Sequence, residues 1–250
     1  SEVERGMDGH FERIGPLAFI TNSQSHTVSV FDVNTREEIR VIDVDEGPEA
    51  LVIHPDQERV FVANNGRNGA GQSISVIEIS SLSVIRTITG VSGPEAMVIH
   101  PDGDLLYVTS PGEHTLPPDG EDDWIIVIDL ESYEIVHEIQ VRDHPWGIEI
   151  SPDGSLLYVA NGHGCGEQRL SCISVIDTHS HTVIAEHHLA PIVGDYSNDG
   201  EEIPEDLHLP ELHVTPDGKR LIVVLMHIDL ILVLDIETME PVENGFFDVW

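Results

Sequence analysis

Lysine is almost absent from this sequence. Lys219 is the only one, and lysine and arginine together number 11 against 46 aspartates and glutamates. The resulting formal net charge of −35 at pH 7 repels phosphate backbones and anionic lipid surfaces. The composition therefore argues against nucleic acid as a partner. It favours a surface from a salt-adapted organism, because screening at high salt removes the repulsion between carboxylates. An acidic surface that binds many cations is the alternative.

Long apolar runs are also missing. The most apolar stretch, residues 221–236, is interrupted by His227 and Asp229, so it resembles two strands more than the ~18 apolar residues of a membrane helix. We therefore expect no membrane insertion. The first 15 residues lack the apolar segment of a signal peptide. A mature exported chain would look the same, and we expect an extracellular, cell-surface or periplasmic location.

The motifs of several enzyme classes are absent too. The sequence has no GxSxG nucleophile elbow, no GxGxxG or Walker phosphate loop and no CxxCH haem attachment motif. Two cysteines are present, Cys165 and Cys172, seven residues apart in one loop. An oxidising compartment would favour a disulfide between them, and two free buried thiols are the alternative.

The sequence does contain a segment, which we call a phrase, that occurs four times with small changes. "HPDQERVFVANNG" (54–66) returns as "HPDGDLLYVTSPG" (100–112), "SPDGSLLYVANGHG" (151–164) and "TPDGKRLIVVLMH" (215–227). A short apolar stretch precedes each phrase and begins at Pro48, Pro94, Pro145 and Pro210, with intervals of 46, 51 and 65 residues. A repeat of this length with several strands per unit is typical of a β-propeller blade.

The second repeat shows the unit plainly. "PEALVIHPD" reads as a first strand and its turn, "RVFVAN" as the second strand, "SISVIEI" as the third and "SVIRTIT" as the fourth. The third-strand phrase occurs five times, at 28–33, 74–79, 125–130, 173–178 and 231–236. The sequence therefore predicts an all-β fold, a single propeller domain of about five four-stranded blades. Their approximate ranges are 7–47, 48–93, 94–144, 145–209 and 210–250. The first strand of the first blade is either the weak "MDGHF" (7–11) or absent.

The stretch "SPDGSLLYVAN…ISVIDTHSHTVI" resembles the YVTN-type β-propeller repeat, over about residues 16–240. This family includes surface-layer-associated and periplasmic YncE-like proteins, and its members usually close with seven blades. The resemblance implies that the ring closes at five blades, that the chain is part of a larger propeller, or that it pairs with another chain. It says little about function, because propellers carry unrelated activities on one scaffold.

Five histidines are candidates for a metal site. His114, His163 and His227 each follow the second strand of a blade, and His144 and His213 lie near blade-to-blade connections, so all five belong to the face that carries the long insertions. We call this the top face. Imidazole is the commonest transition-metal ligand, and these side chains could hold copper or zinc. The alternative is that they are ordinary loop residues where lysine is avoided, and no HExxH spacing is present.

A second candidate site lies at the entrances of the first strands. The repeat places Glu49, Glu95, Trp146 and Glu211 in equivalent positions beside the predicted central channel. Three carboxylates around one opening could bind Ca²⁺, and the tryptophan could pack a ligand. A hydrated acidic channel mouth is the alternative.

Three functions remain open from the sequence. The first is a binding module whose top face holds a protein or small-molecule partner. The second is a metal-dependent, copper-type oxidoreductase or metal carrier, which rests on analogy with other propellers alone. The third is a structural surface-layer component, which would form an oligomer or larger assembly. The sequence leaves open whether the protein is an enzyme.

The charge generates one prediction of its own. Thermal stability should rise steeply from dilute buffer to molar KCl, because screening relieves repulsion among the 46 acidic side chains. Differential scanning calorimetry across a salt series measures it. A melting temperature that stays flat over that range would contradict salt adaptation.

Overall fold

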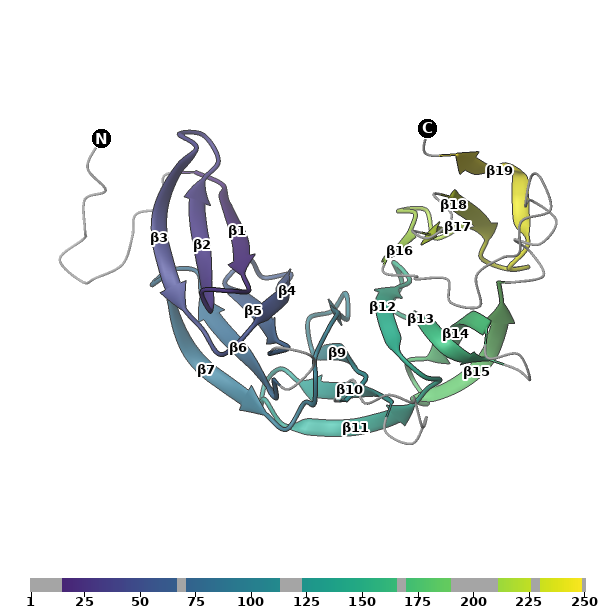
Figure 1. Ribbon diagram of the computed structural model, residues 1–250, viewed down its shortest axis with the longest axis horizontal. Coiled ribbons are helices and arrows are strands. Elements are labelled where there is room, and N and C mark those ends of the chain that lie inside the picture. The colour runs from purple at the N-terminus through teal and green to yellow at the C-terminus, as the bar shows by residue number, and fades with distance from the viewer. Residues whose placement is uncertain are drawn as a thin grey trace. The chain divides into compact units, whose positions relative to one another are not determined.

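The structure is a computed structural model that describes residues 15–66, 71–112, 123–165, 170–189, 211–225 and 230–248. All regular structure in these ranges is β-strand, and Figure 1 shows the strands grouped into small sheets. The predicted all-β class is confirmed. Within the same ranges there is no helix of the length and apolarity needed to cross a bilayer.

The strands form five antiparallel sheets, each built from strands that follow one another in the sequence. The first holds β1 (Leu17–Asn22), β2 (Thr27–Asp32) and β3 (Glu37–Asp43). The second holds β4 (Pro48–Ile53), β5 (Arg59–Asn64), β6 (Ser73–Glu78) and β7 (Ser83–Thr89). The third holds β8 (Met97–Ile99), β9 (Leu105–Ser110), β10 (Trp124–Asp129) and β11 (Ile135–Gln140). The fourth holds β12 (Pro145–Ile150), β13 (Leu156–Cys165), β14 (Leu170–Asp177) and β15 (Thr182–His188). The fifth holds β16 (Glu211–Val214), β17 (Arg220–Leu225), β18 (Leu230–Asp235) and β19 (Pro241–Asp248).

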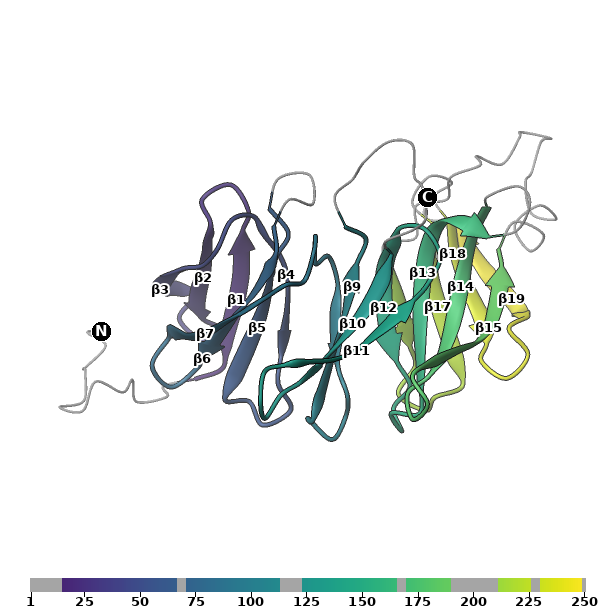
Figure 2. The ribbon, with the colours of Figure 1, turned by 90° about the horizontal axis from the view of Figure 1, so that it is seen from below.

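Each sheet falls inside one predicted blade range, and the antiparallel order within each sheet is that of a propeller blade (Figure 2). The candidate first strand at 7–11 lies outside the described residues. The chain divides into two compact units, Ser1–Met97 with Gly112–His114, and Val98–Pro111 with Thr115–Trp250. The prediction of a single domain therefore stays a prediction.

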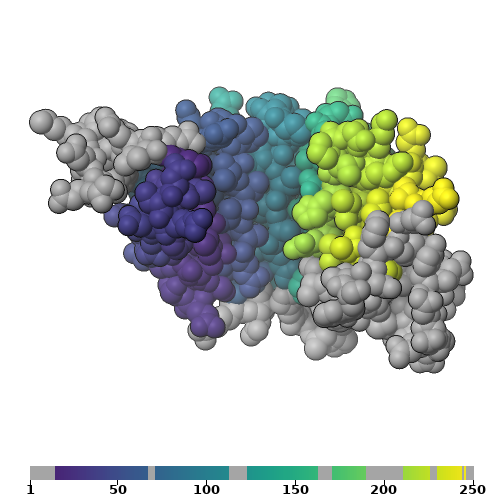
Figure 3. All heavy atoms as spheres, turned by 90° about the horizontal axis from the view of Figure 1, so that it is seen from above, coloured from purple at the N-terminus to yellow at the C-terminus, as the bar shows by residue number. Residues whose placement is uncertain are grey.

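Aliphatic side chains from the second and third strands make the cores. In the first unit Val28 and Val30 of the first sheet pack in one cluster with Val60 and Val62 of the second. In the second unit the fourth and fifth sheets share a cluster of the same kind, which includes Tyr158, Ile173, Leu221 and Leu232. The space-filling view shows part of the surface of the fifth sheet in yellow-green and yellow (Figure 3). Burying each such side chain contributes about 1.5–3 kcal/mol, so stacking of the sheets dominates stability.

A side-chain contact explains why asparagine occupies the same second-strand position in several repeats. Each of three asparagines donates its Nδ2–H to a serine hydroxyl of the neighbouring third strand, in the pairs Asn22–Ser29 (2.9 Å), Asn64–Ser75 (3.0 Å) and Asn161–Ser174 (2.9 Å). The contact satisfies polar groups beside an apolar core, and it fixes the two strands relative to each other.

The outer strand of several sheets carries a bulge at one position. The pairing shifts by one residue in β7, β11 and β15, and the extra residues are Ile85, Val136 and Ile184. These side chains are 44–57% exposed. Bulges at an edge strand interrupt the row of unpaired backbone groups, which discourages pairing with another sheet.

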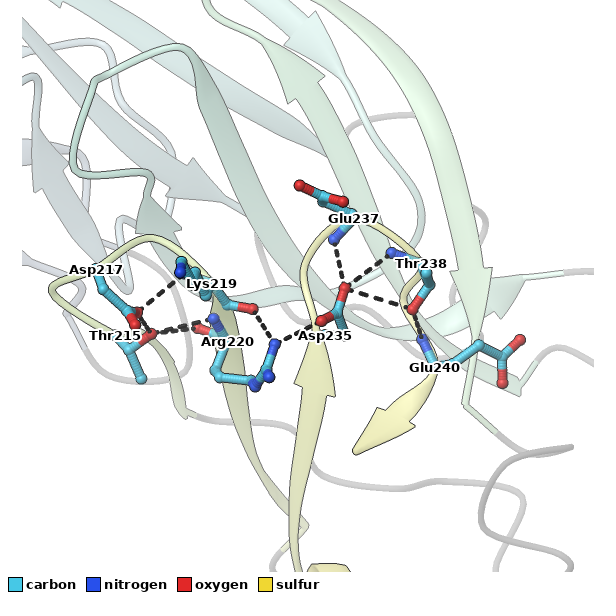
Figure 4. A network of polar contacts seen from close by, with 8 residues as sticks. All are labelled: Thr215, Asp217, Lys219, Arg220, Asp235, Glu237, Thr238 and Glu240. Atoms are coloured by element: carbon cyan, nitrogen blue, oxygen red, sulfur yellow. Dashed lines mark hydrogen bonds and ion pairs between the residues drawn. The ribbon is translucent and has the colours of Figure 1, made fainter. Parts of the chain in front are cut away.

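Aspartates close turns between successive strands of the blades. In the fifth sheet Asp217 accepts hydrogen bonds from the Thr215 hydroxyl (2.6 Å) and the Lys219 amide (3.1 Å), and Arg220 pairs with Asp235, which caps the following turn (Figure 4). The matching Asp153 accepts from the Ser151 hydroxyl and from the Ser155 amide and hydroxyl, and these bonds lower its pKa to about 2. These aspartates hold turns and are not part of a site.

The close approach of one turn to its neighbour gives a test of the fold. Gly154 has φ of +77°, and a Cβ there would lie 2.7 Å from Cε1 of His100 and closer still to Nε2. Gly154→Ala should therefore cost about 1–2 kcal/mol for the backbone and about 1–3 kcal/mol more for the clash. Chemical unfolding in molar salt measures the cost.

Gly218→Ala is the matched control. Gly218 has φ of +69°, but its Cβ would meet nothing closer than Pro152 Cδ at 3.6 Å, so only the backbone cost applies. Adding His100→Ala to Gly154→Ala should bring the cost down to that of Gly218→Ala. Equal costs for the two single variants would show that the turn of the fourth sheet does not lie against His100.

Candidate functional site

The described residues include only part of the predicted metal site. His114 and His227 lie outside the described residues, and so does the side chain of His163, whose backbone is in β13. His144 and His213 are described. No three histidine, cysteine, aspartate or glutamate side chains converge to hold a metal ion within the described ranges. The five-histidine site therefore stays a prediction.

His144 and Trp146 lie together at the entrance of β12. His144 adopts φ of +55°, its amide donates to Asp123 Oδ2 (2.9 Å), and its carbonyl accepts from the amide of Gly162 (2.8 Å). Trp146 is the extra residue of a bulge in β12, and its indole covers Gly162, where a Cβ would lie 2.7 Å from Nε1. The centroids of the two rings are 6.1 Å apart. Glycine at position 162 therefore leaves room for the indole.

A second group joins the innermost strands of the fourth and fifth sheets. His213 on β16 lies between two carboxylates, with Nδ1 3.7 Å from Glu149 Oε2 and Nε2 3.8 Å from Glu211 Oε2. The side chains of His213 and Glu211 are 60% and 65% exposed, whereas that of Glu149 on β12 is only 27% exposed. We call Glu149, Glu211 and His213 the inner-strand cluster.

Burial decides the charge state of the least exposed member. Loss of solvent raises the pKa of Glu149 above its usual 4.5, although the Ile150 amide, which donates to Oε1 at 3.0 Å, and His213 both act to lower it. The carboxyl group therefore holds its proton to higher pH than an exposed glutamate does.

Sequence reasoning placed Glu211 one residue out of position. Glu49 and Trp146 do match, since each is the extra residue of a bulge, in β4 and β12. Glu211 instead pairs with Val224, in the place that Gly147 takes opposite Ala160. The physical reason is length. Pro210 precedes the next turn proline by six residues, against seven in the other repeats, so β16 has no room for the bulge.

This correction explains why Glu149 was missed. With the turns aligned, His213 occupies the position of Glu149, and Val52 and Val98 fill it in the second and third sheets. The sequence does hold a signal for this site. Two successive repeats have a polar residue at an inner-strand position where the two repeats before them have valine. Glu95 lies just before β8, in the other compact unit from Trp146 and Glu211. Convergence of the predicted channel residues therefore stays a prediction.

Cys172 lies on β14, fully buried and in a disulfide bond. The amide of Asn161 lies 3.7 Å from its sulfur. The predicted partner, Cys165, ends β13, and its side chain lies outside the described part, so the pair itself stays a prediction.

Comparison with known proteins agrees with this architecture. Residues 65–245 match the family described as "Lactonase, 7-bladed beta-propeller", and the chain belongs to this family. No curated protein matches the sequence. Among solved structures, hydrazine synthase of Kuenenia stuttgartiensis matches with a TM-score of 0.73 at 20% identity over 88% of this chain. The chain spans 61% of the length of that structure, and the likeness concerns the fold alone. The propeller prediction is confirmed, whereas the YVTN-type assignment stays a prediction.

The half-buried carboxyl group of Glu149 generates a pH-dependent prediction. A carboxyl group with a raised pKa in the folded state costs stability once pH rises above its unfolded pKa, because the folded state must then give up a favoured proton. Glu149→Gln should therefore raise the melting temperature at pH 7 and leave it unchanged below about pH 4. Thermal unfolding in constant molar salt measures both.

Glu211→Gln is the control for that experiment, because this side chain is mostly exposed and its charge is well solvated. It should shift the melting temperature much less at pH 7. A stabilisation of the same size in both variants would assign the effect to the net charge of −35 and not to burial of Glu149.

Proposed function

We propose that this chain is the ligand-binding part of a lactonase-family propeller. A small organic molecule, uncharged or cationic, binds at the inner-strand cluster. The observation that carries the proposal is the position of His213, exposed on β16 and flanked at 3.7 and 3.8 Å by carboxylates from two sheets. Rigid inner strands hold these groups, as a preorganised site requires.

Charge supports the choice of ligand class. Two glutamates flank the only imidazole of the cluster, and the whole chain carries −35, so an anionic ligand meets repulsion at short and long range. A neutral molecule with hydroxyl groups can donate to the carboxylates and exchange a hydrogen bond with the imidazole. Our proposal assigns the binding-module hypothesis from the sequence to β12 and β16. We also propose that the chain is exported, that it is adapted to high salt and that its repeat is of the YVTN type.

Lactone hydrolysis is a second candidate, and the family description together with the carboxylate–histidine contacts favours it. His213 would take a proton from a water molecule, whose oxygen attacks the lactone carbonyl carbon. The ring C–O bond then breaks, and the ring oxygen takes a proton to leave a hydroxy acid. The product is an anion, so the same carboxylates that accept a neutral lactone would favour its release.

Binding is tested with a panel of neutral γ- and δ-lactones, polyols, amines and the matching hydroxy acids, by saturation-transfer NMR in molar KCl. A neutral or cationic compound should bind, and its hydroxy acid should not. His213→Gln should weaken binding at least tenfold, about 1.4 kcal/mol.

His188→Gln is the matched control, since His188 is an exposed histidine on the outer strand β15. It should leave binding unchanged. Proton release in a pH-stat distinguishes binding from hydrolysis, which His213→Gln should slow by about 10²–10⁴-fold. Preferential binding of the anionic acids, or equal effects of the two variants, would contradict the proposal.

A further inference from the structure

We propose that the junction of the third and fourth sheets is an acid-sensitive latch, closed by the stacked rings of His137 and His181 and opened when both rings carry a proton. His137 lies on β11, and His181 lies in the turn between β14 and β15. The ring centroids are 4.1 Å apart, and the ring planes differ by 29°. Both residues belong to the second unit, and the latch involves neither Glu149 nor His213.

The turn conformation directs His181 toward the interior. Its φ is +52°, and Leu82 and Met239 take the same left-handed place in the turns of the second and fifth sheets, with φ of +47° and +55°. Both of those side chains are buried in the core. The repeat therefore uses this turn position to bury an apolar side chain, and the fourth sheet places a half-buried imidazole there instead.

The junction of the fourth and fifth sheets provides an internal comparison. Ala185 pairs with the third strand of its sheet as His137 does, and Met239 takes the place of His181 in the next turn. Met239 belongs to the apolar cluster of these two sheets, and Ala185 packs against that cluster. Neither side chain can take a proton. Two equivalent positions of the second unit thus hold an apolar pair at one junction and an ionisable pair at the other.

The surroundings of His181 favour its neutral form. Its Nδ1 is buried and has no hydrogen-bond partner among the described residues. Loss of solvent lowers its pKa, the positive charge of His137 acts in the same direction, and so does the exposed His179 of the same turn, whereas Asp177 acts to raise it. From β9, the Tyr107 ring lies 6.4 Å from the His181 ring, and burial raises the pKa of Tyr107 to about 12, so this phenol stays uncharged.

The remaining charges near the pair are acidic groups with other roles. Asp102, which acts on Tyr107, pairs with His100 at 2.5 Å in the turn before β9. Glu138 follows His137 on β11, where alternation along the strand turns it to the opposite face. Asp177 caps its own turn, accepting hydrogen bonds from the amide and hydroxyl of Ser180. None of these carboxylates is placed between the two rings.

Protonation therefore acts on the latch in two stages. The first proton leaves one ring neutral, and the second puts two positive charges in rings whose centroids are 4.1 Å apart. Salt screens a partly buried pair of charges less than an exposed pair, so the repulsion persists at high ionic strength. Because the pKa of His181 is lowered in the folded state, the contact stabilises the junction fully above the ordinary value of 6.5, and this stability is lost as pH falls below it.

The titration of His181 in the folded chain is followed through its imidazole NMR signals, in constant molar KCl. Its pKa should lie below 6.5, and His137→Ala should raise it, because this variant removes the second positive charge. His181→Met assigns the signals. It keeps the backbone of the turn, since Met239 adopts the same conformation.

Thermal unfolding tests the latch itself in the double variant His137→Ala/His181→Met, which copies the apolar pair of the next junction. The melting temperature of this variant minus that of the original chain should rise by about 2–4 °C from about pH 7.5 to about pH 5, a usual size for one pairwise contact in a chain of this length. The subtraction cancels the titration of carboxylates that both chains share. Hydrogen exchange at the lower pH should be faster in β11 and in residues 177–182 of the original chain than in the double variant.

His188→Gln is the matched control, since His188 is an exposed histidine of the same sheet. It should leave the pKa of His181 and the pH dependence of unfolding as they are in the original chain. A His181 pKa at or above 6.5, a melting-temperature difference that does not change with pH, or acid-induced exchange that is equal in all five sheets would overturn the latch. If the double variant does not fold, the titration of the original chain and of His137→Ala still decides.

Discussion

Burial of both faces of a sheet is the constraint on which the rest of this structure depends. On β13 and β14, Tyr158 and Ile173 face the fifth sheet, while Leu157 and Ile176 on the opposite face are also fully buried. A strand in this situation cannot alternate apolar and polar residues, because neither side meets water. The repeated second- and third-strand phrases are aliphatic for this reason, and polar residues in them need internal partners such as the Asn–Ser contacts.

The side chains of the middle strands are buried in the core. Residues that can bind a ligand or react with it are therefore found at strand ends, on inner strands and in connections. The inner-strand cluster occupies such a place. It also departs from its neighbours at one repeat position, because Glu149 and His213 stand where the second and third sheets have valine. Differences between equivalent positions are thus more informative here than the repeat itself.

The acidic surface acts on the inner-strand cluster. Loss of solvation raises the pKa of Glu149, the least exposed carboxyl group of the inner-strand cluster. For a ligand, its own charge decides whether the 46 acidic side chains attract or repel it. Neutral and cationic molecules gain from this field, and anions lose. Turn aspartates such as Asp153 take no part, because hydrogen bonds from their own turns hold them ionised.

The sequence by itself determined the class of fold, because the strand phrases, prolines and Pro-Asp turns are local signals that recur in the same order in each repeat. The structure shows that the amides of Asp56 and Asp102 donate to the rings of His54 and His100, which belong to such turns. Only the tertiary structure decided which side chains meet. The missing residue in β16 removes a bulge and moves Glu211 by one position, and stacking of two sheets brings Glu149 to His213 across 64 residues of chain. Such contacts depend on register and on which sheets are neighbours, and neither is written in the local pattern of any one strand.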